Sequence, residues 1–470
     1  MAYNRPSIVS GVTRLDKALF DSILDGVDEK LSTTDANATY VPAKSEYAAV
    51  HAMLAEPTLS WGIGIVGDST GNGPDEWPQF FLSAIAPSYP SLTFQEVGWS
   101  NISEWINRPT VIQTGAAGVR YAQFTGTGNN TSSYLAPASI TGDLDIRVAV
   151  APDAWTGAVD QCVVAKFGSG GARAFRANIT SNGRMSFDWT TDGSTIQTVA
   201  TSSVVIPGIA GQKLFLRYVL DVDNGASGHD IKFYTSTDGS TWTQLGTTIT
   251  RAGVTSLFAA ASTEYEIGGR GAVAEPFKGK YYEVQVRDGI DGPTVTPILP
   301  EHWRANNTTT TVAGAPIFTL VNSSHPGANI AFLNNATRRR KMVANYGQIA
   351  VILSTSHNEG SLTGSSVLTA VTDWATAVDV LIPGMQHVIV TQNPRIAPAD
   401  RGPEQATRRA QYLAYARNKG WSALDTYQAF KSAPDVAALL NVDGFHPNLA
   451  GEKLWANEVL RFMGFTERVS

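Results

Sequence analysis

The sequence predicts an α/β domain that is interrupted by an all-β sandwich and preceded by a short N-terminal helix. Two observations favour this fold class. Short apolar strands alternate with amphipathic helices over residues 60–105 and again after residue 312, which is typical of a parallel sheet covered on both faces. Between residues 118 and 290 the pattern changes to alternating strands without a good amphipathic helix, as in two packed antiparallel sheets.

The predicted boundaries divide the chain of 470 residues into five segments, because a chain of this length is too long for one compact core. The segments are an N-terminal helix (1–34), a linker (35–55), the first part of the α/β domain (56–112), the β-sandwich (113–300) and the second part of the α/β domain (301–470). The two ends of the inserted segment are expected to lie close together at the surface of the interrupted domain.

The N-terminal segment predicts a helix over residues 9–32. Its apolar residues recur at three- and four-residue steps, which places them on one stripe. They are Val12, Leu15, Leu19, Ile23, Val27 and Leu31. A helix of about 20 residues is marginal alone in water, so the stripe is expected to be buried. We expect this burial either in a homo-oligomer or against the chain's own α/β domain.

The α/β elements follow in order. The expected strands are 61–66, 92–97, 317–322, 348–355 and 387–392. The expected helices are 75–86, 365–381, 404–418 and 448–462. In an open parallel sheet, the loops at the carboxyl ends of such strands converge on one crevice, where ligands bind.

The β-sandwich is predicted from alternating apolar residues at 144–150, 213–222 and 281–287. The sequence TDGST occurs twice, at 191–195 and 237–241. Asp-Gly between extended segments is a strong hairpin signal, so both copies are expected to be tight turns.

Composition excludes several function classes. The chain has a net charge of −6 and a pI near 5.7, so neither nucleic acid nor an anionic membrane is an expected partner. No apolar run reaches the length of about 18 residues that a membrane span needs. Cys162 is the only cysteine, which excludes an intrachain disulfide and a cysteine-based zinc site.

Ser69 is the first candidate for chemistry. The apolar strand over 61–66 runs directly into Gly67-Asp68-Ser69. A serine in this position is either a helix cap or a nucleophile. A nucleophilic serine needs a base, and of the seven histidines only His446 has an acid, Asp443, three residues before it. On a tight loop this spacing lets the carboxylate orient the imidazole. The alternative is that His446 is a surface histidine in a loop.

Gly327 and Asn358 are candidates for stabilising an oxyanion. Each follows a predicted strand, as Ser69 does. The backbone N–H of a glycine can approach a substrate closely, and an asparagine offers its side-chain amide. The alternative is that both are ordinary turn residues.

Together these blocks resemble the SGNH (GDSL-type) hydrolases over residues 60–110 and 312–465. The resemblance implies a flavodoxin-like three-layer fold and a serine esterase without a cofactor or a metal ion. It implies that Ser69 is the nucleophile, His446 the base and Asp443 its orienting acid. The oxyanion hole would comprise the N–H groups of Ser69 and Gly327 and the amide of Asn358.

Two departures from the family pattern concern the loops. The second block often has an earlier glycine where this chain has Ser324, and the third often reads Gly-x-Asn-Asp where this chain has 356–359, Ser-His-Asn-Glu. We expect His357, which has no sequence-adjacent acid, to support the site from behind.

The inserted segment resembles laminin-G-like, concanavalin-type lectin domains with a jelly-roll sandwich. The resemblance is carried by LRYVLDVDNG at 216–225 and FYTSTDGSTWTQLG at 233–246. Trp155, Trp189 and Trp242 are candidates for stacking on sugars, and the alternative is that they fill the core. Asp221, Asp223 and Asp230 are either polar loop residues or calcium ligands, and no metal site is predicted.

The order of helix, hydrolase and lectin-like insert resembles minor tail proteins of bacteriophages. This implies a homotrimer in the virion, with host cell-surface glycans and other tail proteins as partners. The first residues, MAYNRPSIVSG, lack an apolar signal-peptide core. Synthesis in the host cytoplasm and release by lysis would agree with this.

Three functions compete. The first is an esterase that removes acyl groups, such as acetyl, from host glycans. The second is a carbohydrate-binding adhesin with a non-catalytic hydrolase scaffold, and the third is a lipase-like esterase with the insert as a lid. The complete set of catalytic blocks favours the first over the second. The absence of a long exposed apolar stripe in the insert argues against the third.

Overall fold

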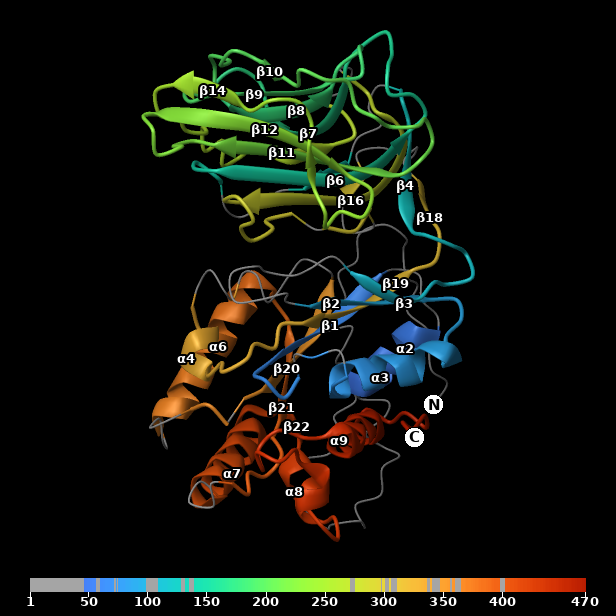
Figure 1. The fold of residues 1–470 in the computed structure, drawn as a ribbon, viewed down its shortest axis with the longest axis vertical. Helices are drawn as coiled ribbons and strands as arrows, with labels where there is room; N and C mark the ends of the chain where they lie inside the picture. Colours follow the sequence, from blue (N-terminus) through green and yellow to red (C-terminus); the bar gives the residue numbers. More distant parts are fainter. Residues whose placement is uncertain are drawn as a thin grey trace, which may run out of the picture. The chain divides into compact units, whose positions relative to one another are not determined.

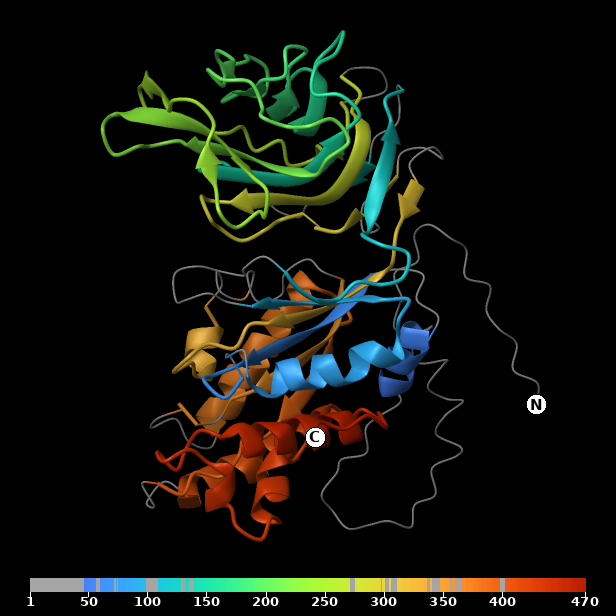
Figure 2. The same cartoon turned by 45° about the vertical axis from the view of Figure 1, so that its right-hand side comes forward.

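The computed structural model describes most of the chain after residue 45. The described residues are 46–55, 60–71, 73, 75–98, 109–127, 132–134, 139–270, 275–296, 298–300, 304–305, 311–335, 339, 347–355, 357–359, 365–397 and 402–470. Contacts divide the chain into two compact units (Figures 1 and 2). Unit 1 is Met1–Ala116, Pro316–Val343 and Gln348–Ser470, and unit 2 is Ala117–Ala315 and Ala344–Gly347. The helix predicted over 9–32 lies outside the described residues.

Unit 1 is built on a seven-stranded sheet in the order β22-β21-β20-β1-β19-β2-β3. The strands are β1 (Trp61–Gly67), β2 (Thr93–Gly98), β3 (Thr110–Gln113), β19 (Ile317–Asn322), β20 (Gln348–Ser354), β21 (Gln386–Val390) and β22 (Ser422–Leu424). All neighbours are parallel except β2 and β3. The central strand β1 is buried at every position, which explains its apolar sequence.

Helices cover both faces of this sheet. They are α2 (Glu46–Ala55), α3 (Trp77–Ile85), α4 (Ile330–Leu333), α6 (Ser365–Leu381), α7 (Gly402–Lys419), α8 (Thr426–Lys431) and α9 (Leu449–Phe462), with 3₁₀ turns η2 (Ala86–Ser88) and η5 (Ala437–Leu439). One core joins the sheet to α2, α3, α8 and α9, and another joins it to α4, α6 and α7. The unit therefore has three layers, with α4 and α6 opposite α2 and α3 (Figure 1).

Two predictions for unit 1 were wrong. The predicted linker 35–55 contains the helix α2, because Val50 and Leu54 are buried in the core that also contains α3 and α9. The sheet is also not purely parallel, since β3 runs antiparallel to β2. An antiparallel neighbour needs no crossover helix, so the strand–helix alternation of the sequence did not indicate it.

Unit 2 consists of two antiparallel sheets that enclose one hydrophobic core (Figure 2). The first has the order β10-β9-β8-β7-β15-β5-β17, and the second β13-β12-β11-β6-β16-β4-β18 with β14 also paired to β12. The strands are β4 (Tyr121–Thr125), β5 (Ser132–Tyr134), β6 (Leu144–Pro152), β7 (Gln161–Phe167), β8 (Arg173–Ile179), β9 (Met185–Trp189), β10 (Ala200–Thr201), β11 (Leu214–Asp221), β12 (Gly228–Ser236), β13 (Thr243–Gln244), β14 (Ile249–Ala252), β15 (Tyr265–Ile267), β16 (Lys278–Asp288), β17 (Arg304–Ala305) and β18 (Thr311–Ala313).

Both TDGST segments lie in hairpins. The first connects β9 to β10 and the second connects β12 to β13, and each pair of strands is antiparallel. Gly193 and Gly239 have φ values of 82° and 73°, a conformation that favours glycine. The hairpin prediction is confirmed at both places.

The structural boundary of unit 2 differs from the predicted segment 113–300. Unit 2 extends to Ala315 because β17 and β18 pair with β5 and β4. These strands have two and three residues, too few for an alternating pattern to be recognised. Among the residues that the structure describes, no helix has both the length and the apolar character needed to cross a bilayer.

Candidate active site

The candidate residues of unit 1 follow three adjacent parallel strands. In the sheet, β1 lies between β19 and β20 and is parallel to both. Ser69 follows β1, Gly327 follows β19 and Asn358 follows β20. All three therefore lie in loops at the same edge of the sheet, where α/β domains bind their ligands.

Ser69, His446 and Asp443 form one hydrogen-bonded series. Ser69 Oγ lies 2.7 Å from His446 Nε2, and His446 Nδ1 lies 2.7 Å from Asp443 Oδ2. A carboxylate only accepts hydrogen bonds, so Nδ1 carries the proton and Nε2 presents its lone pair to the serine hydroxyl. The structure thus brings together the three side chains that the sequence singled out, in the arrangement of a nucleophile, a base and an orienting acid.

The loop before α9 holds Asp443 by local hydrogen bonds. Asp443 Oδ1 accepts hydrogen bonds from the N–H groups of Phe445 (2.8 Å) and His446 (3.0 Å). Partial burial raises the pKa of Asp443, but hydrogen bonds from His446 and these backbone groups outweigh that effect, so its pKa lies below the ordinary value. The group is therefore a carboxylate at neutral pH, which can stabilise a protonated imidazole at His446.

Gly327 lies in the loop after β19 in a left-handed backbone conformation. Its φ is 73°, a left-handed conformation that favours glycine. A Cβ at this position would meet no atom within 4 Å, so the backbone there lies in open space and glycine is needed for its conformation. Its loop also contacts the loop of Ser69, since His325 N donates to Gly67 O at 3.1 Å.

Asn358 is positioned by Asp68. Asn358 Nδ2 donates to Asp68 Oδ2 at 3.2 Å, and Asp68 Oδ1 accepts hydrogen bonds from the N–H (3.1 Å) and the hydroxyl (2.9 Å) of Thr70. Asp68 is completely buried. An amide NH₂ has two hydrogens, so Asn358 can bond to Asp68 with one and donate to an oxyanion with the other.

Ser324, one of the departures from the family pattern, is buried against the Ser69 loop. A Cβ on Gly67 would lie 3.0 Å from Ser324 Oγ, and a Cβ on Gly71 would lie 3.1 Å from it. Asn322 Nδ2, at the end of β19, donates to Gly71 O at 2.7 Å. The loop of Ser69 therefore packs closely on the end of β19. A Cβ at 67 would also lie 2.8 Å from the backbone oxygen of Ser354, so glycine is needed there for lack of space, and position 71 is tight.

A polar network behind the triad was not predicted from the sequence. His357 N donates to Gln392 Oε1 (2.7 Å), and Gln392 Nε2 donates to Thr70 Oγ1 (3.1 Å). Asn393 Nδ2 donates to Phe445 O at 2.8 Å, directly before His446. The network thus links the Ser69 loop to the His446 loop. The available signal was the position of Gln392 and Asn393, two polar residues at the carboxyl end of an apolar strand.

His357 belongs to this buried network. Its Nε2 lies 2.8 Å from Asn393 O, and because a carbonyl only accepts, Nε2 carries the proton. Burial lowers the pKa of His357, which keeps the ring neutral at pH 7. Its ring packs 4.5 Å from that of Phe445, and the ring of Phe445 lies 4.3 Å from that of His446. The expectation that His357 lies behind the reacting groups agrees with these contacts.

Glu359 anchors the loop that carries Asn358. Its carboxyl accepts hydrogen bonds from Thr355 Oγ1 and from the N–H of Ile330 at the start of α4. Burial raises the pKa of Glu359, although these hydrogen bonds and Arg408 partly oppose that effect. The contacts connect the end of β20 to the segment after β19, so the two proposed oxyanion loops support each other.

Two of the three candidate tryptophans in unit 2 cannot contact sugar. Trp155 is 7% exposed and Trp189 is fully buried, with its indole N–H donating to Thr255 Oγ1 at 3.0 Å. The prediction was wrong for these two because both rings fill the core between the sheets. Trp242 is half-buried and lies 5.7 Å from the guanidinium groups of Arg147 and Arg217.

The acidic loop residues of unit 2 bond to protein groups. Asp230 Oδ1 accepts hydrogen bonds from Asn224 Nδ2 (3.0 Å) and Thr250 Oγ1 (2.8 Å), and Asp223 Oδ1 accepts one from the N–H of Gly225 (3.1 Å). Within the described parts of the chain, no group of three or more histidine, cysteine or acidic side chains is arranged to hold a metal ion.

No protein-family model and no curated protein matches the sequence. Solved structures that match the chain include a peptidoglycan O-acetylesterase, with 11% identity, 88% of this chain and 93% of that chain covered, and a TM-score of 0.38. Another is a catalytic mutant of an acetylxylan esterase from Geobacillus stearothermophilus (17% identity, 33% and 75% covered, TM-score 0.28).

A heptameric SAP-like pentraxin from Limulus polyphemus has 15% identity, with 39% of this chain and 79% of that chain covered and a TM-score of 0.28. These TM-scores are too low for the likenesses to bear on fold or function.

Proposed function

We propose that the chain is a serine esterase that hydrolyses ester groups, above all O-acetyl groups, on host cell-surface glycans. One observation carries the proposal: Ser69 Oγ lies 2.7 Å from His446 Nε2, whose ring is oriented by Asp443 at 2.7 Å. A serine that only caps a helix does not need a histidine at hydrogen-bond distance. A structural histidine does not need its second nitrogen directed at a serine.

The geometry supports a two-step mechanism. His446 Nε2 takes the hydroxyl proton as Ser69 Oγ attacks the ester carbon, and a tetrahedral oxyanion forms. The N–H groups of Ser69 and Gly327 and the amide of Asn358 are the proposed donors to that oxyanion. When the intermediate collapses, the sugar oxygen takes the proton from His446 and leaves. Water then attacks the acyl-serine, again with His446 as base, and releases the free acid and Ser69.

The exposure of the triad supports a polymeric substrate. The side chains of His446 and Asp443 are 34% and 46% exposed. A base so close to solvent can be reached by a sugar within a long chain. A buried tunnel for a fatty acyl group would instead surround the triad with apolar side chains. This favours a glycan esterase over the lipase-like alternative.

In this proposal unit 2 binds the glycan. Trp242 is the candidate that remains, because its half-buried ring lies on two arginine side chains and keeps exposed surface. Aromatic rings held in this way present a flat apolar face, which suits the face of a sugar ring. Trp242→Ala is expected to weaken binding to host cells and to leave turnover of a small ester unchanged.

We also propose that the chain acts in a phage tail as a homotrimer held by the stripe over residues 9–32. The spacing of the apolar residues supports an oligomer, and the sequence resemblance supports the phage tail and a trimer over a dimer. Light scattering on the full chain and on a chain starting near Pro42 tests the oligomer, and detection of the chain in purified virions tests the location. A monomer in both preparations, or virions without the chain, would contradict it.

Purified protein on p-nitrophenyl acetate and then on O-acetylated wall glycan tests the esterase. Acetate release by the wild type, absent in Ser69→Ala, is the expected result. A folded wild-type protein that hydrolyses neither ester but still binds host cells would instead indicate an adhesin with a non-catalytic scaffold.

A further inference from the structure

Arg395 lies beside the triad and has no part in the proton transfers. It follows β21, and its guanidinium Cζ lies 4.6 Å from the centre of the Phe445 ring. The same ring contacts the imidazole of His446, at 4.3 Å between centres. The positive charge of Arg395 and the proposed base therefore both lie against one phenyl ring.

The backbone around Arg395 is held in place. Arg395 N donates to Gln405 Oε1 at 2.6 Å, and its Nε donates to Ala397 O at 3.0 Å. The next residue, Ile396, donates its N–H to Gly444 O at 2.9 Å, inside the loop of Asp443 and His446. Position and orientation of the guanidinium are thus fixed relative to the triad, which lowers the entropy cost of binding a ligand there.

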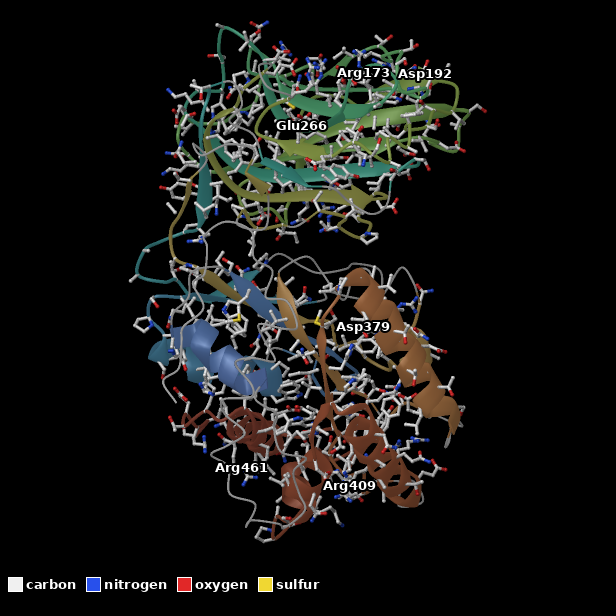
Figure 3. The ribbon with its side chains drawn as sticks, turned by 180° about the vertical axis from the view of Figure 1, so that it is seen from behind. Arg173, Asp192, Glu266, Asp379, Arg409 and Arg461 are labelled. Carbon is white, nitrogen blue, oxygen red and sulfur yellow. The ribbon has the colours of Figure 1, made fainter. Side chains whose placement is uncertain are left out.

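The charge of Arg395 is not neutralised in the described part of the chain. Neither terminal guanidinium nitrogen has a hydrogen-bond or ion-pair partner among the described residues, and the side chain is half-buried. Arg409 provides the contrast in the same unit. The guanidinium of Arg409, which is labelled in Figure 3, also lies over a ring, that of Tyr427, but it forms an ion pair with the buried carboxylate of Asp425.

We propose that Arg395 binds an anionic group of the substrate, a carboxylate or a phosphodiester of an acidic glycan, close to the ester that Ser69 attacks. The inference rests on the proposed esterase function and names its substrate class. With Nε occupied by Ala397 O, the terminal nitrogens remain to bind two oxygens of one anion. The chain has a net charge of −6, so an acidic polymer is not attracted by the molecule as a whole and needs a local cation.

Two substitutions separate charge from packing. Arg395→Met keeps a long apolar side chain on Phe445 and removes the charge, and Arg395→Lys keeps the charge. Arg461→Gln is the matched control. Arg461 is a surface arginine on α9, 54% exposed, and its loss changes the net charge equally (Figure 3). Any shared effect of the control and Arg395→Met would be due to net charge alone.

The assay measures acetate release from three O-acetylated polymers: neutral xylan, carboxylate-bearing polygalacturonate and phosphodiester-bearing teichoic acid. Arg395→Met is expected to lower kcat/KM about 10-fold on whichever acidic polymer the wild type prefers, mainly through KM, as the loss of one charge-assisted contact predicts. On neutral xylan, the decrease in kcat/KM caused by Arg395→Met is expected to be smaller. Added salt should reduce the wild-type preference and have no such effect on Arg395→Met. Arg395→Lys should keep part of the preference.

Equal losses on neutral and acidic polymers would show a role in packing on Phe445 and overturn the proposal. A wild-type protein that prefers neither acidic polymer over xylan would also overturn the proposal. Equilibrium binding of the non-acetylated acidic polymers to Ser69→Ala, with and without Arg395→Met, measures recognition without turnover. Weaker binding of the double variant therefore supports the role of Arg395 even if no ester is hydrolysed, and equal binding contradicts it.

Discussion

The two aspartates nearest Ser69 are held in opposite ways. Asp68 is completely buried and accepts hydrogen bonds from Thr70 and Asn358, whereas the side chain of Asp443 is 46% exposed and bonds to His446. Exposed ion pairs contribute little to stability, while buried polar groups that lose a partner are costly. We call Ser69, His446 and Asp443 the exposed or reacting half of the site, and Asp68 with its partners the buried or supporting half. The reacting half faces solvent, and its geometry depends on the buried half.

The largest expected effect is on the exposed half. Ser69→Ala should lower kcat on p-nitrophenyl acetate by roughly 10⁴- to 10⁶-fold, as loss of a triad member does in serine hydrolases. Stability should not change, because the hydroxyl contacts only a partly exposed histidine. Turnover and thermal unfolding of the variant check this, with Ser432→Ala, an exposed serine at the end of α8, as control. Turnover near the wild-type rate would end the assignment of Ser69.

Substituting Asp443 and Asp68 in turn tests whether the exposed half of the site reacts and the buried half supports it. Asp443→Asn should lower kcat by roughly 10²- to 10⁴-fold, because Nδ1 loses its acceptor, and change stability by less than about 1 kcal/mol. Asp68→Ala should cost about 2–4 kcal/mol in the free energy of unfolding, because the N–H of Thr70 and the amide of Asn358 lose a buried acceptor. Urea unfolding and kcat measure both. If Asp443→Asn unfolds more readily than Asp68→Ala, the division into a reacting half and a supporting half is wrong.

Asn358→Ala tests both halves of the site at once, since Asn358 bonds to buried Asp68 and is the proposed donor to the oxyanion formed at Ser69. Loss of one oxyanion donor should lower kcat by roughly 10²- to 10³-fold while proton transfer survives. The bond to Asp68 is lost as well, so the free energy of unfolding should also fall by about 1 kcal/mol. Asn358→Asp keeps the shape and removes the donor, so it should lose as much activity. A variant with lower stability and unchanged kcat would assign Asn358 to the supporting half alone.

The exposed half of the site was predictable from sequence, whereas only single members of the buried half, Asn358 and His357, were singled out and their partners were not. Ser69 follows an apolar strand, and Asp443 and His446 lie three residues apart, so each signal is local. The contacts of His357, Gln392 and Asn393 join loops far apart in the chain, and no local spacing indicates them.

The fold shows the same division between local and tertiary information. Long strands such as β6 and β11 were predicted within two residues of their ends, because alternation over seven or more residues is a clear signal. The helix α2 was missed, since it is buried only by its tertiary contacts with the core of α3 and α9. Trp189 was misjudged for a related reason: sequence alternation does not say which face of a strand is covered by the opposite sheet. Trp155 lies in the loop between β6 and β7 and is buried only by tertiary contacts.

The smallest effect on turnover is expected at a third carboxyl group behind the Ser69 loop. Glu452, on α9, accepts a hydrogen bond from the N–H of Trp77 at 2.9 Å. Burial, with a smaller contribution from nearby Glu76, raises its pKa to about 9. The folded state therefore keeps a proton at pH 7 that the unfolded chain releases near pH 4.5. Stability from this group is present below pH 4.5 and is lost as the pH rises toward 9.

Glu452→Gln should remove this loss, because the amide is neutral at every pH and its carbonyl can accept the same hydrogen bond. We expect the variant to exceed the wild type in free energy of unfolding by on the order of 3 kcal/mol at pH 8, and by little at pH 4.5. Urea unfolding at the two pH values measures the difference, with Glu404→Gln, a carboxyl group 46% exposed on α7, as control. Turnover at pH 7 should stay within a factor of about two, since neither form of Glu452 contacts the triad. A variant that is less stable than the wild type at pH 8 would show that Glu452 is charged in the folded state and would place a second ionised carboxylate in the supporting half of the site.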